Sequence, residues 1–244
     1  MSGFGRLIGV GLGPGDPELV SLKALRILGE APVIAYFAKA GRRGHARTIA
    51  DAHLADAQKI EEALFYPMTV ETPFDDPAYI FALSNFYRAS AERLAAHLCA
   101  GRDVALLCEG DPLFYGSFMH LYERLKVEFV CEVVPGISAM SGAWSAAGLS
   151  MAWGDDGLTV LAATMPLEAL TERLERAEAA VVMKVGRNLE KLRQALRAAG
   201  RLADAHYVAY ATQERQTSLP LAKLQGDAAP YFSIVLVPGK GRRP

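Results

Sequence analysis

The chain has 244 residues, enough for one large α/β domain or two smaller ones. Apolar residues make up 51% and charged residues 22%, a balance that excludes a largely disordered chain. The net charge of −1 argues against a general nucleic-acid-binding protein. Three cysteines without CxxC spacing argue against a disulfide scaffold or a structural zinc site, and they favour a reducing, cytoplasmic compartment.

No targeting or membrane segment is expected. Residues 1–5 lack the basic and apolar regions of a secretory signal. Residues 133–154 carry no charged side chain, but their prolines, glycines and serines make the stretch less apolar than a membrane span. We therefore expect no membrane contact, and we predict a buried strand, turn and helix in this stretch.

The first half of the chain alternates apolar strand patterns with helical spacing. Strands are predicted at residues 7–10, 33–37, 104–108 and 129–134. Helices are predicted at residues 18–28, after the N-cap Asp76 up to Gly101, and between the last two strands. This β-α-β-α order predicts a mostly parallel sheet with helices on both faces.

The second half continues the alternation after a polar, glycine-rich link at residues 154–157. Strands are predicted at residues 158–163, 180–184, 207–210, 219–224 and 231–237, and helices at 167–176 and 189–199. The two late strands, with a turn between them, suggest a mixed sheet with an antiparallel edge. The sequence thus predicts two α/β domains, at residues 1–153 and 154–244.

A glycine-rich turn follows the first predicted strand, at residues 9–17. A dinucleotide-binding turn is disfavoured, because Pro14 delays the helix and Tyr36-Phe37 stand where an acidic residue would hold a ribose. Two alternatives remain open, a purely structural turn and a turn that lines a substrate cleft. In the second case Gly13 and Pro14 are candidate substrate contacts.

The tripeptide Gly-Asp-Pro occurs twice, at residues 15–17 and 110–112, each time between a strand and a helix. In a parallel sheet such turns lie along the carboxyl edge, where ligands bind. A third turn, Pro135-Gly136-Ile137-Ser138, follows another strand in the same way. The alternative for Asp111 and Ser138 is simple helix capping.

In their order and spacing these three motifs resemble the tetrapyrrole (corrin/porphyrin) methyltransferases, over nearly the whole chain. The segments at residues 7–19 and 180–187 are most similar to the precorrin-2 C-20 methyltransferases of cobalamin synthesis. The resemblance implies a homodimer of two-domain chains, with S-adenosylmethionine (SAM) in the cleft between the domains, and a tetrapyrrole substrate. A cobalt-bearing substrate or another ring carbon remains an alternative, and so does a protein or RNA substrate on the same fold.

Carried over position by position, the resemblance also implies a set of donor-binding residues. The set is Gly110, Asp111, Leu113, Gly116, Ser138, Ala139, Met183, Ala211 and Thr212. No metal is expected, because the five histidines show no metal-ligand spacing.

Three polar residues at or near predicted strand ends are candidates for catalysis: Asp111, Lys184 and Tyr210. Methyl transfer to carbon requires a proton to leave or move, and a positioned side chain can assist that step. The alternative for Lys184 and Tyr210 is that they only anchor the substrate.

A basic loop follows the second predicted strand. Four Lys or Arg residues and one histidine lie between residues 39 and 47. We expect Arg42, Arg43, His45 and Arg47 to bind the acetate and propionate groups of a tetrapyrrole, because guanidinium groups suit carboxylates. The alternative is a solvated basic turn without a ligand.

Overall fold

The computed structural model describes residues 3–54, 58–67 and 76–241. The chain divides into two compact units, Met1–Ser138 and Ala139–Pro244. The sequence placed this boundary later, after residue 153. The difference arises because helix α5 (Ala139–Ala147) packs its apolar face on strands of the second unit, where Ala143 joins Val208 and Ile234.

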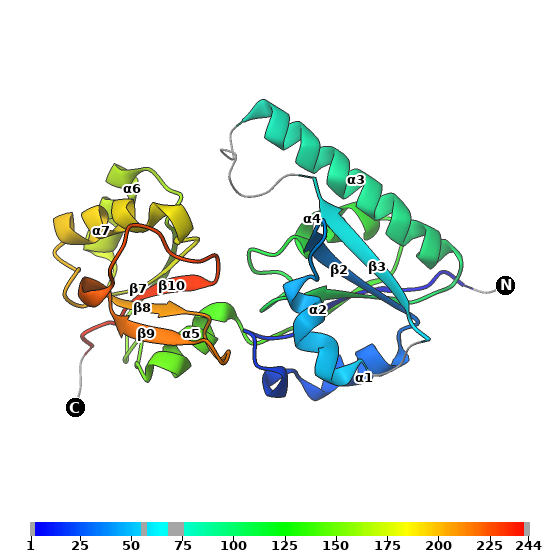
Figure 1. Ribbon diagram of the computed structural model, residues 1–244, viewed down its shortest axis with the longest axis horizontal. Coiled ribbons are helices and arrows are strands. Elements are labelled where there is room, and N and C mark those ends of the chain that lie inside the picture. Colours follow the sequence, from blue (N-terminus) through cyan, green and yellow to red (C-terminus); the bar gives the residue numbers. More distant parts are fainter. Residues whose placement is uncertain (1–2, 55–57, 68–75, 242–244) are drawn as a thin grey trace. The chain divides into compact units, whose positions relative to one another are not determined.

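The first unit is built on a five-stranded sheet in the order β3-β2-β4-β1-β5 (Figure 1). Its strands are β1 (Leu7–Gly11), β2 (Val33–Lys39), β3 (Ile60–Tyr66), β4 (Val104–Cys108) and β5 (Cys131–Val134). Every pairing is parallel, as predicted. Its helices are α1 (Leu22–Glu30), α2 (His45–Ile49), α3 (Pro77–Cys99) and α4 (Phe118–Leu125).

Alternation along the strands divides the core of this unit between the two faces of the sheet. Leu7 and Leu106 pack with residues of α3 and α4, whereas Ile8 and Leu107 pack with residues of α1 and α2. Both faces are therefore buried, which explains the uninterrupted apolar runs of β1 and β4.

Local capping sets the helix boundaries. The Asp76 side chain accepts hydrogen bonds from the backbone N–H groups of Ala78 and Tyr79, so α3 begins where predicted. The first helix begins later than predicted, because Ser21 caps α1 through the Ala24 N–H. Residues Pro17–Leu19 form a separate 3₁₀ turn.

Strand β3 was not predicted. It lies at an edge of the sheet, pairs only with β2 and carries two charged side chains. Glu61 and Glu62, near its beginning, bind Arg47 and Arg93 respectively. Charged residues on an edge strand hide the apolar alternation that identifies a strand.

The second unit contains a mixed sheet in the order β6-β7-β10-β8-β9. Its strands are β6 (Leu158–Ala162), β7 (Ala179–Met183), β8 (His206–Ala209), β9 (Thr217–Pro220) and β10 (Ser233–Val237). The two late strands do not pair with each other: β10 lies antiparallel between β7 and β8, and β9 forms the antiparallel edge. Helices α6 (Leu167–Arg176) and α7 (Leu189–Ala198) pack on one face, and α5 packs on the other.

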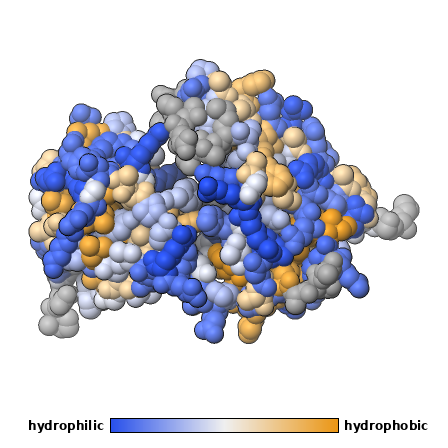
Figure 2. Space-filling model, in the orientation of Figure 1, coloured by the Kyte–Doolittle hydropathy of each residue, from blue (hydrophilic) through white to orange (hydrophobic). Residues whose placement is uncertain are grey.

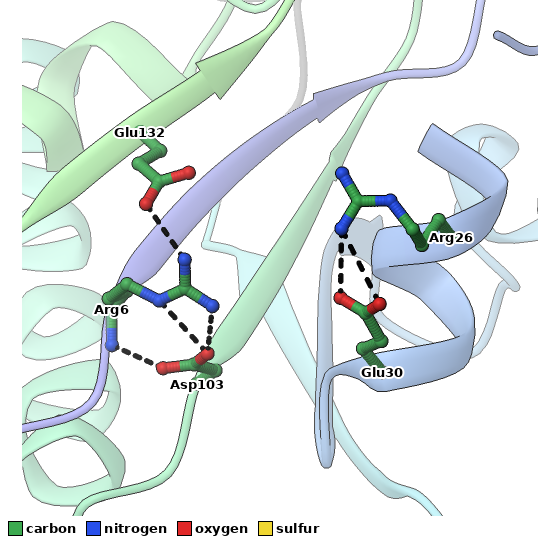
Figure 3. A network of polar contacts seen from close by, with 5 residues as sticks. All are labelled: Arg6, Arg26, Glu30, Asp103 and Glu132. Carbon is green, nitrogen blue, oxygen red and sulfur yellow. Dashed lines mark hydrogen bonds and ion pairs between the residues drawn. The ribbon is translucent and has the colours of Figure 1, made fainter. Parts of the chain in front are cut away.

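A charged network closes the amino end of the first sheet (Figure 3). The Arg6 guanidinium binds Asp103 at 2.6 Å and Glu132 at 2.8 Å, and the Asp103 carboxylate also accepts the Arg6 backbone N–H at 2.7 Å. These residues stand just before or within β1, β4 and β5, so one arginine ties the beginnings of three strands together. The Arg26–Glu30 pair in the same view lies within α1.

Candidate functional site

The two Gly-Asp-Pro turns meet at the carboxyl edge of the first sheet. Gly13 and Gly110 form an isolated antiparallel bridge, in which the Gly110 N–H donates to the Gly13 carbonyl at 2.8 Å. In return the Gly13 N–H donates to the Gly110 carbonyl at 3.4 Å. The expected convergence of the two turns is therefore observed, and Gly13 uses both backbone groups in it.

The third turn joins them at a distance that only glycine allows. A Cβ atom at Gly136 would lie 2.1 Å from the Gly110 carbonyl oxygen, and one at Gly11 would lie 2.4 Å from the Gly136 nitrogen. No side chain fits at either position without a backbone shift. The turns that follow β1, β4 and β5 thus form one backbone-to-backbone junction.

Asp111 is held within this junction by both carboxylate oxygens. Its Oδ1 accepts the Leu113 N–H at 2.9 Å, and its Oδ2 accepts the Gly136 N–H at 3.2 Å. The first bond shapes its own turn, and the second ties that turn to the next. This geometry assigns Asp111 a positioning role, while catalysis by Asp111 stays a prediction.

Backbone strain marks the same segments. Among the described residues, the non-glycine residues with positive φ are Tyr115 (54°), Lys184 (57°), Tyr210 (51°) and Thr212 (66°). Such conformations cost free energy and concentrate at functional sites. Lys184, Tyr210 and Thr212 are predicted site residues, and Tyr115 lies in the predicted donor-binding segment between Leu113 and Gly116.

The strained residues of the second unit lie at one edge of its sheet. Strands β7 and β8 both run antiparallel to β10, so their carboxyl ends lie at the same edge. Lys184 directly follows β7 and Tyr210 directly follows β8, and the Tyr210 N–H donates to the Phe232 carbonyl at 2.8 Å. Met183 is the last residue of β7, and Ala211 and Thr212 follow Tyr210.

Side-chain contacts order the segment after β8. The Thr212 N–H donates to the Gln216 side-chain oxygen at 2.8 Å, and the Arg215 guanidinium lies 3.6 Å from the centre of the Tyr210 ring. A stacked guanidinium of this kind stabilises the ring by cation–π attraction. The predicted donor-binding residues thus fall in both units: Ser138 ends the first, and Ala139 begins α5 in the second.

The basic loop was predicted only in part. Arg47 is buried, with 5% of the residue exposed, and it binds Glu61 at 2.6 Å and Asp51 at 2.5 Å. Its Nε, Nη1 and Nη2 atoms all donate to these two carboxylates, a geometry that favours a structural role, while substrate binding by Arg47 stays a prediction. Arg43 is exposed but pairs with the same Asp51 at 2.6 Å. The Arg47 hydrogen bond in turn lowers the pKa of Glu61.

Arg42 and His45 remain candidates for substrate contacts. Both side chains are exposed, and no ion pair engages Arg42 within the part of the chain that the structure describes. His45 begins the short helix α2, which replaces the second half of the expected loop. Pro14 is half-buried beside the Gly13–Gly110 bridge.

Two functional candidates were missed by sequence reasoning, Glu109 and Ser117. Ser117 occupies the N-cap position of α4 without capping it. Its hydroxyl instead lies 2.5 Å from the Tyr66 hydroxyl and accepts a hydrogen bond from Tyr87 at 3.1 Å. Ser117 therefore fixes the end of the Gly110–Gly116 turn to β3 and α3. Glu109 begins that turn, directly after β4.

The described residues show neither a metal-type cluster nor a membrane-type helix. Hydrophilic and hydrophobic residues are interspersed over the face in Figure 2. In residues 3–54, 58–67 and 76–241, no three His, Cys, Asp or Glu side chains are grouped so that they could hold a metal ion. None of the helices described is both long and apolar enough to cross a membrane.

Comparison with protein-family models identifies the family of this chain. The model of the Tetrapyrrole (Corrin/Porphyrin) Methylases matches residues 6–225. The chain belongs to this family. The resemblance stated from the sequence motifs is thereby confirmed.

Individual tetrapyrrole methylases are similar over nearly the whole length. A precorrin-2 C(20)-methyltransferase of a Sinorhizobium species is 56% identical over 242 residues, with 99% of this chain and 98% of that protein covered. A cobalt-precorrin-2 C(20)-methyltransferase of Salmonella typhimurium is 28% identical, with 96% of each covered.

Solved structures share the fold. The methyltransferase CobJ has a TM-score of 0.70 at 20% identity, covering 98% of this chain and 96% of that one. The uroporphyrin-III C-methyl transferase of Thermus thermophilus, solved with S-adenyl homocysteine, has a TM-score of 0.64 at 24% identity, covering 97% and 98%. The prediction of two α/β units of the tetrapyrrole methylase fold is confirmed.

Proposed function

We propose that this protein transfers a methyl group from SAM to C-20 of precorrin-2, as a step of cobalamin synthesis. The observation that carries the proposal is the 56% identity, over nearly both full lengths, to a precorrin-2 C(20)-methyltransferase. The second candidate is cobalt-precorrin-2, supported by the Salmonella relative at half that identity. The chain acts as a cytoplasmic homodimer in this proposal.

The residues present fit SAM. The donor carries two positive charges, on its sulfonium and ammonium groups, and the junction of the first unit offers the acidic side chains of Asp16 and Asp111. In this proposal Lys184 and the segment Tyr210–Thr212, where positive φ angles occur, are the residues of the second unit that contact the donor. SAM brings a methyl group that its sulfonium already activates.

The work left to the chain is alignment and exclusion of water. Asp111 fixes the turn that follows β4, and the glycine junction keeps that turn against its two neighbours. Arg42 binds a carboxylate of the tetrapyrrole, since its guanidinium is exposed at the same edge. Lys184 and Tyr210 act on the substrate from the second unit, as anchors or as proton-transfer groups.

The test is anaerobic incubation with SAM and either precorrin-2 or cobalt-precorrin-2. Mass spectrometry is expected to show the gain of one methyl group on precorrin-2, and NMR is expected to locate it on C-20. Faster turnover of the cobalt form supports the second candidate instead. Methylation of neither compound, with folded protein that binds SAM, overturns the proposal. Light scattering tests the dimer separately.

A further inference from the structure

Glu109 stands at the centre of the first unit's carboxyl edge. It is the first residue after β4, the middle strand of the sheet, and it precedes Gly110 of the bridge with Gly13. The residue is exposed, whereas Cys108 and Gly110 on either side are buried. Its side chain therefore reaches solvent directly beside the Gly13–Gly110 bridge.

The carboxyl group is anchored by the backbone and not by a cation. The Ala46 N–H of α2 hydrogen-bonds to it. The neighbouring cations are engaged elsewhere: Arg47 binds Asp51 and Glu61, and Arg43 binds Asp51. No ion pair involves Glu109 in the described ranges 3–54, 58–67 and 76–241. The Glu109 carboxyl group lies beside the helix that carries Arg47 but forms no ion pair with it.

The environment tunes this group toward proton transfer. Although part of the residue is open to solvent, the protein around the carboxyl group removes water and raises the pKa of Glu109 to about 7, which the Ala46 N–H only partly opposes. The charged groups on the adjoining elements are His45 and Arg47 on α2, Asp16 on the first turn and Asp111 on its own turn. None of them contributes to the shift.

We propose that Glu109 is the general base that takes the proton from the methylated carbon. The proposal rests on the proposed function. The carbon's π electrons form the new C–C bond while the S–C bond of the sulfonium breaks and its electron pair stays on sulfur. The positively charged product then loses the hydrogen of that carbon as a proton to the Glu109 carboxylate, which restores the conjugated ring and passes the proton to solvent.

Asp111 is less suited to this role, although it lies two residues away. Both of its oxygens already accept backbone hydrogen bonds, and protonating either one breaks a contact that holds the junction together. Glu109 accepts one backbone N–H and has acceptor capacity left. The two carboxylates of the same turn thus divide the positioning and proton-transfer roles.

The test compares Glu109→Gln with wild type and with Glu128→Gln, an exposed glutamate in the loop after α4. Glu109→Gln is expected to lower kcat by about 10²–10³-fold. SAM affinity and the KM for the tetrapyrrole are expected to change less than about threefold. Wild-type kcat rises with pH through about 7, because the base works ionised, and Glu109→Gln loses this limb. Glu128→Gln matches wild type.

A second measurement does not depend on turnover. NMR titration of protein labelled with ¹³C in its glutamate carboxyl groups is expected to show one group titrating near pH 7, absent from Glu109→Gln. Wild-type kcat in Glu109→Gln overturns the proposal, and so does titration of Glu109 in the normal range. Glu109→Asp, which retains a carboxylate, is expected to keep the pH-dependent limb at reduced kcat. If wild type methylates no tetrapyrrole, the proposed function fails, while the titration still reports on Glu109.

Discussion

The two ends of the first unit's sheet are closed by opposite means. At the amino end, the Arg6 side chain binds Asp103 and Glu132 across β1, β4 and β5 (Figure 3). At the carboxyl end, the turns that follow the same three strands meet through backbone atoms of Gly11, Gly110 and Gly136. The amino end is held by long, partly exposed side chains, whereas the closest contacts at the carboxyl end are between backbone atoms.

This contrast indicates which end of the sheet tolerates substitutions. An ion pair with partly exposed partners stabilises modestly and can be lost at small cost. A junction of backbone atoms leaves nearby side chains available for chemistry, but it admits no added atom. We therefore expect substitutions at the carboxyl end to have far larger effects than substitutions at the amino end.

The largest effect is expected from Gly136→Ala. Its Cβ would lie 2.1 Å from the Gly110 oxygen, so the turns after β4 and β5 must separate. We expect a loss of about 3 kcal/mol of unfolding free energy, near the upper part of the range for overpacking, together with a loss of SAM binding. Urea unfolding and calorimetry measure the two effects.

Gly29→Ala is the matched control. Gly29 lies in α1, and a Cβ there meets nothing within 4 Å. Alanine favours the helix, so this variant is expected to be more stable by about 0.5 kcal/mol. Equal behaviour of the two alanine variants would contradict the close contact at Gly136.

An intermediate effect is expected from Asp111→Asn. The amide keeps one acceptor oxygen but turns an NH₂ group toward one of the two N–H groups that Asp111 now satisfies. We expect about 1–2 kcal/mol of destabilisation and roughly tenfold weaker SAM binding. Asp76→Asn serves as the control, because asparagine caps a helix as well as aspartate does. Unchanged SAM affinity in Asp111→Asn argues against the junction as a donor site.

The smallest effect is expected at the amino end, from Asp103→Asn. Burial acts against ionisation of Asp103, but hydrogen bonds from Arg6 outweigh it and lower its pKa. The pair therefore stabilises above the unfolded pKa of about 3.9, and the stabilisation is lost as pH falls through the lower folded value. With 41% of the Arg6 side chain exposed, we expect only about 1 kcal/mol at pH 7.

Urea unfolding of wild type and Asp103→Asn at a series of pH values checks this. The difference between the two proteins is expected to shrink below about pH 3, while SAM affinity stays at the wild-type value throughout. A stability difference that is constant down to pH 2 would mean that the Arg6 contacts do not depend on the charge of Asp103.

Much of the fold could be predicted because its signals are local. Strand β4 and helix α6 have the predicted bounds, since an apolar run and a helical period identify buried and amphipathic elements. Strand β3 was not predicted, because its glutamates bind Arg47 and Arg93, which are distant in sequence. The boundary between the units was predicted too late in the chain, because only packing shows that α5 belongs with β8 and β10.

The candidate site was likewise predictable where its signals are local in sequence, and not where they depend on tertiary contacts. Repetition of Gly-Asp-Pro on a parallel sheet was enough to predict that the two turns converge. The role of Arg47 depended on Glu61, in a strand that was not recognised, although Asp51 four residues away was a visible sign of internal pairing. Tertiary contacts also determine the pKa of Glu109. Its surroundings include the Ala46 N–H, which the sequence does not place beside it.

The position of β1 between β4 and β5 constrains how the chain is made. Leu7 pairs with Val104 and Cys131, and β1 has no pairing with β2. At translation speeds of about 5–20 residues per second, the roughly 92 residues between β1 and β4 take about 5–20 s to emerge. For that time the apolar segment Leu7–Gly11 has neither of its sheet neighbours. Strand β1 therefore takes its place in the sheet only after β4 and β5 have followed it, and its apolar side chains stay exposed in the nascent chain until then.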